Sequence, residues 1–233
     1  MSSQVPLILS VETATTNGSI AIAEGSRILL SKKGDGLISH SNTLLSDIDN
    51  LLKQVNRAFE RIDVFAIAIG PGSFTGLRIG IATIKALGTI ADRMCAAIPT
   101  LAAVARSAGA NPSVVATLPA GRGEVFAQLF SVSPQGGVTE IDQPAHLSPR
   151  EVIGKYQALA NLSWTGEGAE AHRAEILSSE AAVKSDWRIV PAATNLAENV
   201  SALALLTAAN NELVTAENLH AIYVRPSDAE LKK

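Results

Sequence analysis

The segment that decides the fold is Gly70-Pro-Gly-Ser-Phe-Thr-Gly-Leu-Arg-Ile-Gly80, a glycine-rich loop that leads into an apolar helix predicted over 77–91. The run 64–69 before the loop is nearly all apolar, which is typical of a parallel strand covered on both faces. Small and branched residues alternate along the helix, so two of its faces are apolar or small. The second of these faces indicates either another core layer or a subunit interface.

Phosphate binding is the first function to consider for this loop, because backbone N–H groups at the start of a helix favour anions. A Walker loop requires Lys and then Ser or Thr directly after its last glycine, whereas Leu77 and Arg78 follow Gly76. The dinucleotide fingerprint also fails, because Thr75 stands at the position of its third glycine. The alternative is a tight turn with close helix packing, and spacing alone leaves both interpretations open.

The N-terminal part predicts three antiparallel strands, over 5–11, 19–23 and 27–31, with a hairpin turn at 24–26. Apolar residues at helical spacing predict an amphipathic helix over 40–56. With the strand and helix around the glycine loop, the order becomes βββαβα. This order matches the half-domain of the actin-like ATPase and ribonuclease H-like fold, and we predict an α/β protein of two tandem βββαβα-type domains.

The rest of the chain predicts a second, smaller α/β domain over 100–209, after a first domain over 1–99. The segment from about 210 to 233 is expected to return to the first domain. The further predicted elements are helices over 101–107, 149–160, 169–177 and 196–209, and strands over 114–118, 124–131, 162–165 and 221–224.

Composition indicates an ordinary globular protein. The chain has 233 residues, 47% hydrophobic and 18% charged, enough for one large or two modest cores. Aromatic residues are 4%, so the core is expected to consist of Ala, Leu, Ile and Val. A net charge of −3 without any basic run argues against direct binding of nucleic acid. Because the N-terminal apolar run is short and lacks a basic region, we expect a cytoplasmic protein without a membrane span.

Candidate catalytic and metal-binding side chains are scattered. Cys95 is the single cysteine, and the histidines His40, His146, His172 and His220 are widely separated, each expected to be a surface or capping residue.

A Ser73–His40–Asp63 triad is conceivable, but no spacing brings these residues together, and Ser73 is more simply a turn residue. Glu12 stands where actin-like enzymes place a metal-linked Asp, and we favour local hydrogen bonding to Thr13 or Thr15.

Four segments together resemble the TsaB family, also called YeaZ. They are the glycine loop with its helix start, Ser10-Val-Glu-Thr-Ala-Thr15, His40-Ser-Asn-Thr-Leu-Leu45 and Tyr223-Val-Arg-Pro226. The resemblance implies the fold of TsaD, the catalytic subunit that transfers a threonylcarbamoyl group from its adenylate to the adenosine beside the tRNA anticodon. It also implies TsaD-like and TsaE-like ATPase partners, and a contact with tRNA that is indirect.

The comparison with TsaD implies that this chain is no enzyme. Relatives of TsaD carry a His-x-x-x-His metal pair, and Thr100 and Val104 stand at the matching positions. We therefore expect no catalytic residue, no metal and no cofactor bound by this chain alone, with ATP or ADP only at a partner interface. The alternative is an actin-like-fold enzyme acting alone, either a small-metabolite kinase or a glycopeptidase-like hydrolase.

Two sets of site residues follow. The helical interface with a TsaD-like partner, or with a second copy when that partner is absent, is expected at Leu44, Leu45, Ile48, Leu77, Gly80, Ile81 and Ile84. The family-signature loop comprises Gly70, Pro71, Gly72, Ser73, Phe74, Thr75, Gly76 and Arg78. The chain departs from the family pattern at Pro119-Ala120-Gly121, where many members have Asp-Ala-Arg, and at Ala221, where a proline is expected.

Overall fold

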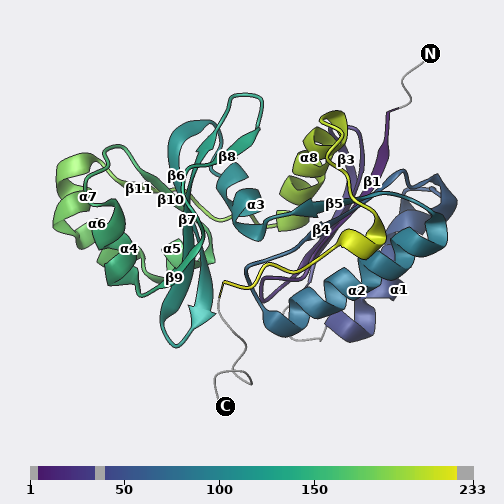
Figure 1. Cartoon of the computed structure of the whole chain (residues 1–233), viewed down its shortest axis with the longest axis horizontal. Coiled ribbons are helices and arrows are strands. Elements are labelled where there is room, and N and C mark those ends of the chain that lie inside the picture. The colour runs from purple at the N-terminus through teal and green to yellow at the C-terminus, as the bar shows by residue number, and fades with distance from the viewer. Residues whose placement is uncertain (1–4, 35–39, 225–233) are drawn as a thin grey trace. The chain divides into compact units, whose positions relative to one another are not determined.

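The computed structural model describes residues 5–34 and 40–224, with side chains from Thr43 onward in the helix that begins at His40. The chain forms two compact units (Figure 1). Unit 1 comprises residues 1–100 and 194–222, and unit 2 comprises residues 101–193 and 223–233. The sequence analysis assigned 196–209 to the second domain. The helix there belongs to unit 1 because it packs on that unit's sheet.

Unit 1 contains a five-stranded sheet in the order β3-β2-β1-β4-β5. The first three strands pair antiparallel, whereas β4 and β5 run parallel to β1. The strands are β1 (Leu7–Glu12), β2 (Ser19–Glu24), β3 (Arg27–Lys33), β4 (Val64–Ala68) and β5 (Cys95–Ile98). The predicted α/β fold is confirmed, since helices alternate with the parallel strands β4 and β5 after the antiparallel strands β1 to β3.

Three helices cover the two faces of this sheet: α1 (His40–Gln54), α2 (Phe74–Ala91) and α8 (Leu196–Ala209). Leu9 and Val11 share one apolar cluster with side chains of α1 and α2. Ser10, between them, donates a hydrogen bond to the Ala197 carbonyl of α8, 2.8 Å away. Because neighbouring side chains of a strand point to opposite faces, α8 lies across the sheet from α1 and α2 (Figure 1).

Unit 2 contains a six-stranded sheet in the order β11-β10-β6-β7-β8, with β9 paired to β7. Its strands are β6 (Asn111–Gly121), β7 (Glu124–Val132), β8 (Val138–Glu140), β9 (Ala145–Leu147), β10 (Ser163–Thr165) and β11 (Arg188–Ile189). Its helices are α4 (Pro149–Tyr156), α5 (Glu167–Ala171), α6 (Arg173–Ser178) and α7 (Glu180–Ser185), and α3 (Thr100–Arg106) begins at the last residue of unit 1.

The core of unit 2 depends on aromatic side chains, which corrects the expectation of a purely aliphatic core. Trp164 is almost fully buried between Trp187, at a ring distance of 5.3 Å, and Tyr156, at 6.2 Å. The chain has only two tryptophans, and both lie in this one cluster. A low overall aromatic content therefore did not exclude a local aromatic core.

Other boundaries differ from the sequence analysis for local reasons. Helix α2 starts at Phe74, because Ser73 caps it, rather than at Leu77. The predicted helix 169–177 is broken at His172, whose φ of −111° is not helical, into α5 and α6. The predicted strand 221–224 is not a strand. Its residues end an irregular segment that contains the short helix η2 (Ala216–Asn218).

Helix α2 is the one described helix long and apolar enough to cross a membrane by length and composition. Its inner face, with Leu77, Ile81 and Ile84, is buried in the core of unit 1. Its outer side carries Arg78 and Lys85. These contacts indicate a core helix of unit 1.

One carboxylate ties together the sheet, the loop before β9 and helix α4 of unit 2. Asp142 accepts hydrogen bonds from the Leu129 backbone N–H, at 2.8 Å, and from the Tyr156 hydroxyl, also at 2.8 Å. Lys155 forms an ion pair with it at 2.7 Å. Burial first, and then Asp142, raise the pKa of Tyr156 above its ordinary value.

We predict that Tyr156→Phe destabilises unit 2 by about 1.5–3 kcal/mol, because the lost hydrogen bond is to a charged group. Lys155→Ala should cost about 1 kcal/mol or less, since that ion pair is partly exposed. Tryptophan fluorescence during urea unfolding measures this, because both tryptophans report on unit 2.

The pH dependence has a definite sign. Above a pH of about 10, unfolded tyrosine loses its proton while folded Tyr156 keeps it, so stability should fall as the pH rises. Tyr156→Phe should remove this part of the decline. An equal decline in both proteins would contradict the assignment.

Candidate functional site

The glycine loop is tied to two neighbouring segments of unit 1. The Gly70 N–H donates to the Thr100 hydroxyl oxygen at 2.9 Å, and the Thr100 N–H donates back to the Gly70 carbonyl at 2.8 Å. The Ser73 N–H donates to the Ala14 carbonyl at 2.7 Å. The loop, which contains a cis Gly70–Pro71 peptide, is therefore held against the turn after β1 and the start of α3.

Two backbone donors in the first turn of α2 are bonded within the helix start itself. The Ser73 hydroxyl accepts from the Gly76 N–H at 3.2 Å, and the Ser73 carbonyl accepts from the Leu77 N–H at 2.8 Å. The Thr13 hydroxyl donates to the Gly76 carbonyl at 2.7 Å. A phosphate at this helix start would have to displace the Ser73 cap. The geometry thus favours the structural interpretation of the loop over a phosphate cradle.

The glycines of the loop permit close approach to the end of β1. A Cβ atom on Gly72 would lie 2.5 Å from the Ala14 carbonyl oxygen, and one on Gly76 would lie 1.9 Å from the Thr13 carbonyl oxygen. Farther along α2, a Cβ atom on Gly80 would lie 2.2 Å from the Thr13 hydroxyl oxygen. Each position therefore excludes any larger residue unless the backbone moves.

The other loop residues divide between core and surface. Pro71 is buried, whereas Ser73, Thr75 and Arg78 are exposed. The Arg78 guanidinium lies 3.8 Å from the centre of the Phe74 ring, a cation–π contact along the first turn of α2. The loop thus presents one cationic and two hydroxyl side chains outward.

Glu12, at the end of β1, is buried and hydrogen-bonded locally. Its carboxylate accepts from the Thr15 N–H at 2.6 Å and from the Thr15 hydroxyl at 2.8 Å, and Ser19 lies at 3.4 Å. The expectation of local hydrogen bonding is confirmed, with Thr15 as the partner, while Thr13 bonds to Gly76 instead. These bonds stabilise the turn between β1 and β2.

A hollow of about 140 Å³ lies beside this turn in unit 1. Its lining includes Glu12, Asn17, Lys33 and the Lys32–Asp47 ion pair. Pockets that enclose a drug-sized ligand are roughly 300–1,000 Å³. The hollow is smaller than such a pocket, and the expectation of ATP or ADP at a partner interface stays a prediction.

The two positions that match the metal-binding histidines of TsaD relatives have packing roles here. Thr100 is fully buried, with its hydroxyl oxygen bonded to Gly70. Val104 is buried in unit 2, where its Cγ1 atom would lie 2.8 Å from a Cβ atom on Gly166. Valine offers no donor atom to a metal. Within residues 5–34 and 40–224, no group of three or more His, Cys, Asp or Glu is placed to hold a metal ion.

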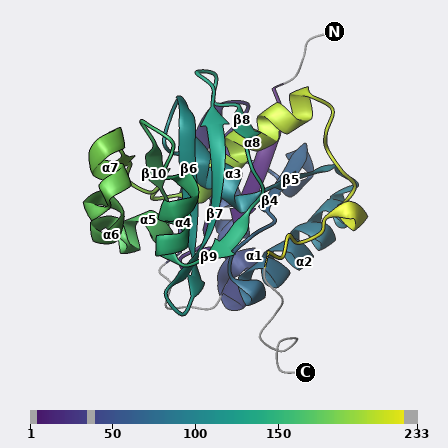
Figure 2. The ribbon, with the colours of Figure 1, turned by 60° about the vertical axis from the view of Figure 1, so that its left-hand side comes forward.

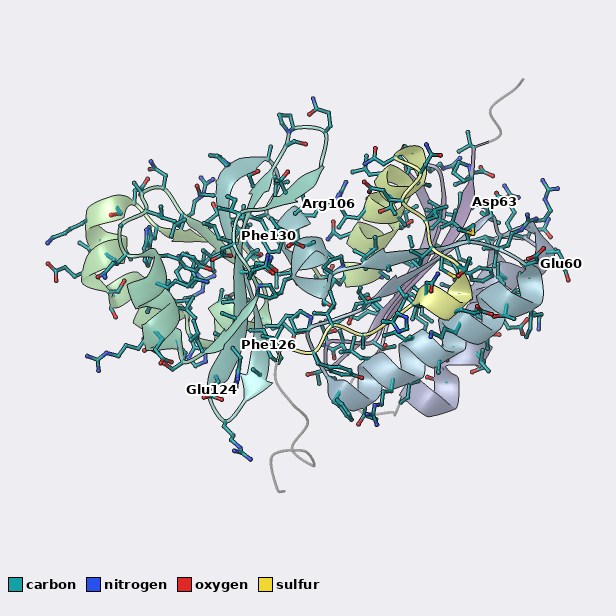
Figure 3. The ribbon with its side chains drawn as sticks, in the orientation of Figure 1. Glu60, Asp63, Arg106, Glu124, Phe126 and Phe130 are labelled. Carbon is teal, nitrogen blue, oxygen red and sulfur yellow. The ribbon has the colours of Figure 1, made fainter. Side chains whose placement is uncertain are left out.

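The conceivable triad is not assembled. Asp63 precedes β4, where its carboxylate accepts a hydrogen bond from the Leu7 N–H at 2.8 Å (Figure 3). Ser73 lies beyond the other end of the same five-residue strand, which alone spans roughly 15 Å. The His40 side chain lies outside the described residues. Cys95 is buried, and burial raises the pKa of its thiol to about 11, which makes it a poor nucleophile.

The other histidines lie near acidic side chains or in solvent. His146 of β9 has its Nε2 atom 2.7 Å from Glu124 of β7, an ion-pair distance without hydrogen-bond geometry (Figure 3). His172 lies 3.7 Å from Glu175, and His220 is exposed.

The predicted interface residues are mostly core residues. Buried within unit 1 are Leu44, Ile48, Leu77, Gly80, Ile81 and Ile84, and only Leu45 is exposed, at 61%. Gly80 faces Thr13 and Ile67 of its own unit, so it cannot admit a partner helix. The exposed residues of α2 are instead Thr75, Arg78, Ala82, Ala86, Thr89 and Ile90, the last 75% exposed. The existence of a helical interface stays a prediction.

The comparisons with known proteins fit this geometry. Residues 36–229 match the TsaD family of tRNA N6-adenosine threonylcarbamoyltransferases. The chain is 26% identical to the tRNA threonylcarbamoyladenosine biosynthesis protein TsaB of Escherichia coli, over 94% of both chains. It is 28% identical to TsaB of Haemophilus influenzae, over 66% of this chain and 67% of that protein. The chain belongs to the TsaB (YeaZ) branch of the TsaD family.

Solved structures of the TsaB (YeaZ) branch have the same fold. YeaZ from Pseudomonas aeruginosa superposes with a TM-score of 0.77 at 27% identity, over 94% of this chain and 99% of that chain. A second structure, described as similar to the peptidase YeaZ from Pseudomonas aeruginosa, gives 0.78 at 29% identity, over 94% and 100%. The predicted actin-like, ribonuclease H-like fold is thereby confirmed.

The departure from the TsaB pattern at 119–121 lies in the hairpin between β6 and β7. Gly121, Arg122 and Gly123 have φ angles of 82°, 54° and 79°, and all three are exposed. Two of these three left-handed positions are glycines, which adopt such φ angles without strain. The other departure, Ala221, packs against the core cluster of unit 1.

We predict opposite effects for two helical glycines. Gly80→Ala should destabilise the protein by about 1–3 kcal/mol, because its Cβ overlaps the Thr13 hydroxyl that bonds to Gly76. Gly154→Ala in α4, where a Cβ meets nothing within 4 Å, should stabilise by up to about 1 kcal/mol. Thermal unfolding followed by circular dichroism separates them. If Gly80→Ala instead stabilised the protein, Gly80 could not lie against Thr13 as the structure places it.

Metal content is a separate prediction. The paired-histidine positions are occupied by Thr100, whose hydroxyl is bonded to Gly70, and by Val104. Purified protein should therefore hold no stoichiometric zinc or iron. Chelation should leave its melting temperature unchanged. Elemental analysis after dialysis is the measurement. About one metal ion per chain would refute it.

Proposed function

We propose that this chain is a non-catalytic partner subunit in the formation of N6-threonylcarbamoyladenosine on tRNA. It acts with a TsaD-like catalytic subunit and a TsaE-like ATPase, in the cytoplasm. The names of its relatives supply the pathway. The observation that carries the non-catalytic role is the use of Thr100 and Val104 for packing within a transferase fold.

The residues themselves support the absence of an active site of its own. Transfer of an acyl-type group needs donors aimed at developing charge, or a positioned acid and base. The Glu12 carboxylate is already bonded to Thr15, and the Ser73 hydroxyl caps α2. The side chains that a related enzyme would direct at a substrate thus stabilise the fold of this chain.

The proposed docking surface is the outer face of helices α1 and α2, which pack against each other. On α2 it comprises Arg78, Ala82, Ala86 and Ile90, and on α1 it includes Leu45. Small side chains such as Ala82 and Ala86 let a partner helix approach closely, while Leu45 and Ile90 supply apolar area. A second copy of the chain would use the same face when the partner is absent.

Charge supports an indirect relation to tRNA. The net charge of −3 and the absence of a basic run give little attraction for a phosphate backbone. In this proposal the partner binds the tRNA. ATP or ADP binds where the partner supplies part of the site, since the hollow of unit 1 is smaller than pockets that enclose a drug-sized ligand.

We predict that Ala82→Arg lowers the affinity for a TsaD-like partner by roughly 5- to 150-fold, because overpacking an interface costs about 1–3 kcal/mol. The fold should be unaffected, since Ala82 is exposed. Ala174→Arg, at an exposed helical position of unit 2, is the matched control and should bind normally. Calorimetric titration of the partner measures both.

A reconstituted threonylcarbamoylation assay tests the role directly. Omitting the chain should abolish modification, and Ala82→Arg should lower it at low protein concentration but recover when supplied in excess. Modification that is unaffected by omission would refute the proposal. Turnover of a nucleotide or peptide by the isolated chain would instead favour an enzyme.

A further inference from the structure

The last part of unit 1 forms a segment that we name the C-terminal strap, residues 211–222. It follows α8 and returns across the side of α2 (Figures 1 and 2). Val214 forms an isolated antiparallel bridge with Cys95 at the outer edge of β5, with both N–H···O distances 2.8 Å. Leu219 is 1% exposed and belongs to the core cluster that also contains the inner face of α2.

The strap touches the C-terminal half of α2. The Lys85 ammonium donates to the Glu217 carbonyl at 3.1 Å. A Cβ atom on Gly88 would lie 3.5 Å from the Cβ of Ala216, which is itself buried. This half of α2 is therefore held by the strap as well as by the sheet.

The end of the strap touches the glycine loop from which α2 starts. The Ile222 N–H donates to the Ile69 carbonyl at 2.7 Å. A Cβ atom on Gly70, whose φ is +115°, would lie 2.4 Å from the Ile222 carbonyl oxygen. The passage of the strap is thus one reason why glycine stands at position 70.

We propose that the C-terminal strap is a positioning element for the outer face of α2, and through it sets the affinity for the partner subunit. This inference rests on the proposed function. The strap holds α2 at two places, its starting loop and its C-terminal half, so it fixes the shift and rotation of the helix along the sheet. A face of small side chains binds by close contact, and such contacts tolerate little displacement.

Leu219→Ala tests the proposal, because it leaves a cavity beneath the strap without altering any exposed residue of α2. If the competent position of α2 falls to about a tenth of the population, the affinity for the partner falls about tenfold. Leu219→Met, which conserves the volume, should restore binding. Hydrogen exchange of the 74–91 amides in the free protein should rise in the alanine variant.

The matched control is Leu203→Ala, a buried leucine of α8 on the opposite face of the sheet. It makes a similar cavity in the same unit and should leave partner affinity unchanged. If either alanine variant fails to fold, the pair Leu219→Val and Leu203→Val replaces it. Binding is compared where circular dichroism shows both proteins folded.

The outcomes separate this inference from the proposed function. The strap's positioning role would be overturned if a folded Leu219 variant bound the partner normally although hydrogen exchange in α2 had risen. It would also be overturned if the Leu203 control lowered partner affinity equally. In either case the docking role of α2 would stand if Ala82→Arg still weakened binding. Unchanged binding by Ala82→Arg would overturn the proposed docking surface instead.

Discussion

Unit 1 depends on the close approach of the glycine loop and α2 to the end of β1. At Gly72, Gly76 and Gly80 a single Cβ atom would fall within 2.5 Å of an oxygen of Thr13 or Ala14. The hydrogen bonds from Thr13 to Gly76 and from Ser73 to Ala14 depend on the same close approach of the two backbones. The opposite side of α2 is exposed and includes Ala82 and Ala86 together with Arg78 and Ile90. The contact thus determines both the packing inside and the surface outside.

Much of the unit 1 fold could be predicted from local patterns, because β4 is a continuous apolar run and α1 is clearly amphipathic. The orientation of α2 could not, since small residues occur on both of its faces and periodicity does not distinguish them. The signal that separates the faces is the kind of small residue. Glycines 76, 80 and 88 lie inward, where backbone or side chains come within a Cβ distance, and alanines 82 and 86 lie outward. A rule that weighs glycine above alanine for burial would have separated the buried and exposed faces of α2 correctly.

The remaining errors in the sequence-based predictions concern contacts between residues that lie far apart in the sequence. Helix α8 is apolar nearly all round, so its sequence does not say which sheet it joins, and only contacts such as Ser10 with Ala197 assign it to unit 1. The strap carries one isolated bridge and a short 3-10 helix, neither of which has a sequence period. In unit 2, Trp164 and Trp187 are 23 positions apart, yet their rings lie 5.3 Å apart at the centre of the core. Composition averages over the chain and cannot report such a cluster.

On the proposed function, a transferase fold keeps its architecture while its polar groups bond within the chain. Each polar side chain at a position of catalytic interest has a bonding partner within unit 1: Glu12 has Thr15, Ser73 has Gly76, and Thr100 has Gly70. Buried polar groups are costly unless they are bonded, so the buried Glu12 and Thr100 need these partners, whereas the exposed Ser73 caps α2. These hydrogen bonds within unit 1 also stiffen the glycine loop and the start of α2. On the proposed function this stiffness has a use, because a subunit that acts by contact alone requires a fixed surface rather than an accessible pocket.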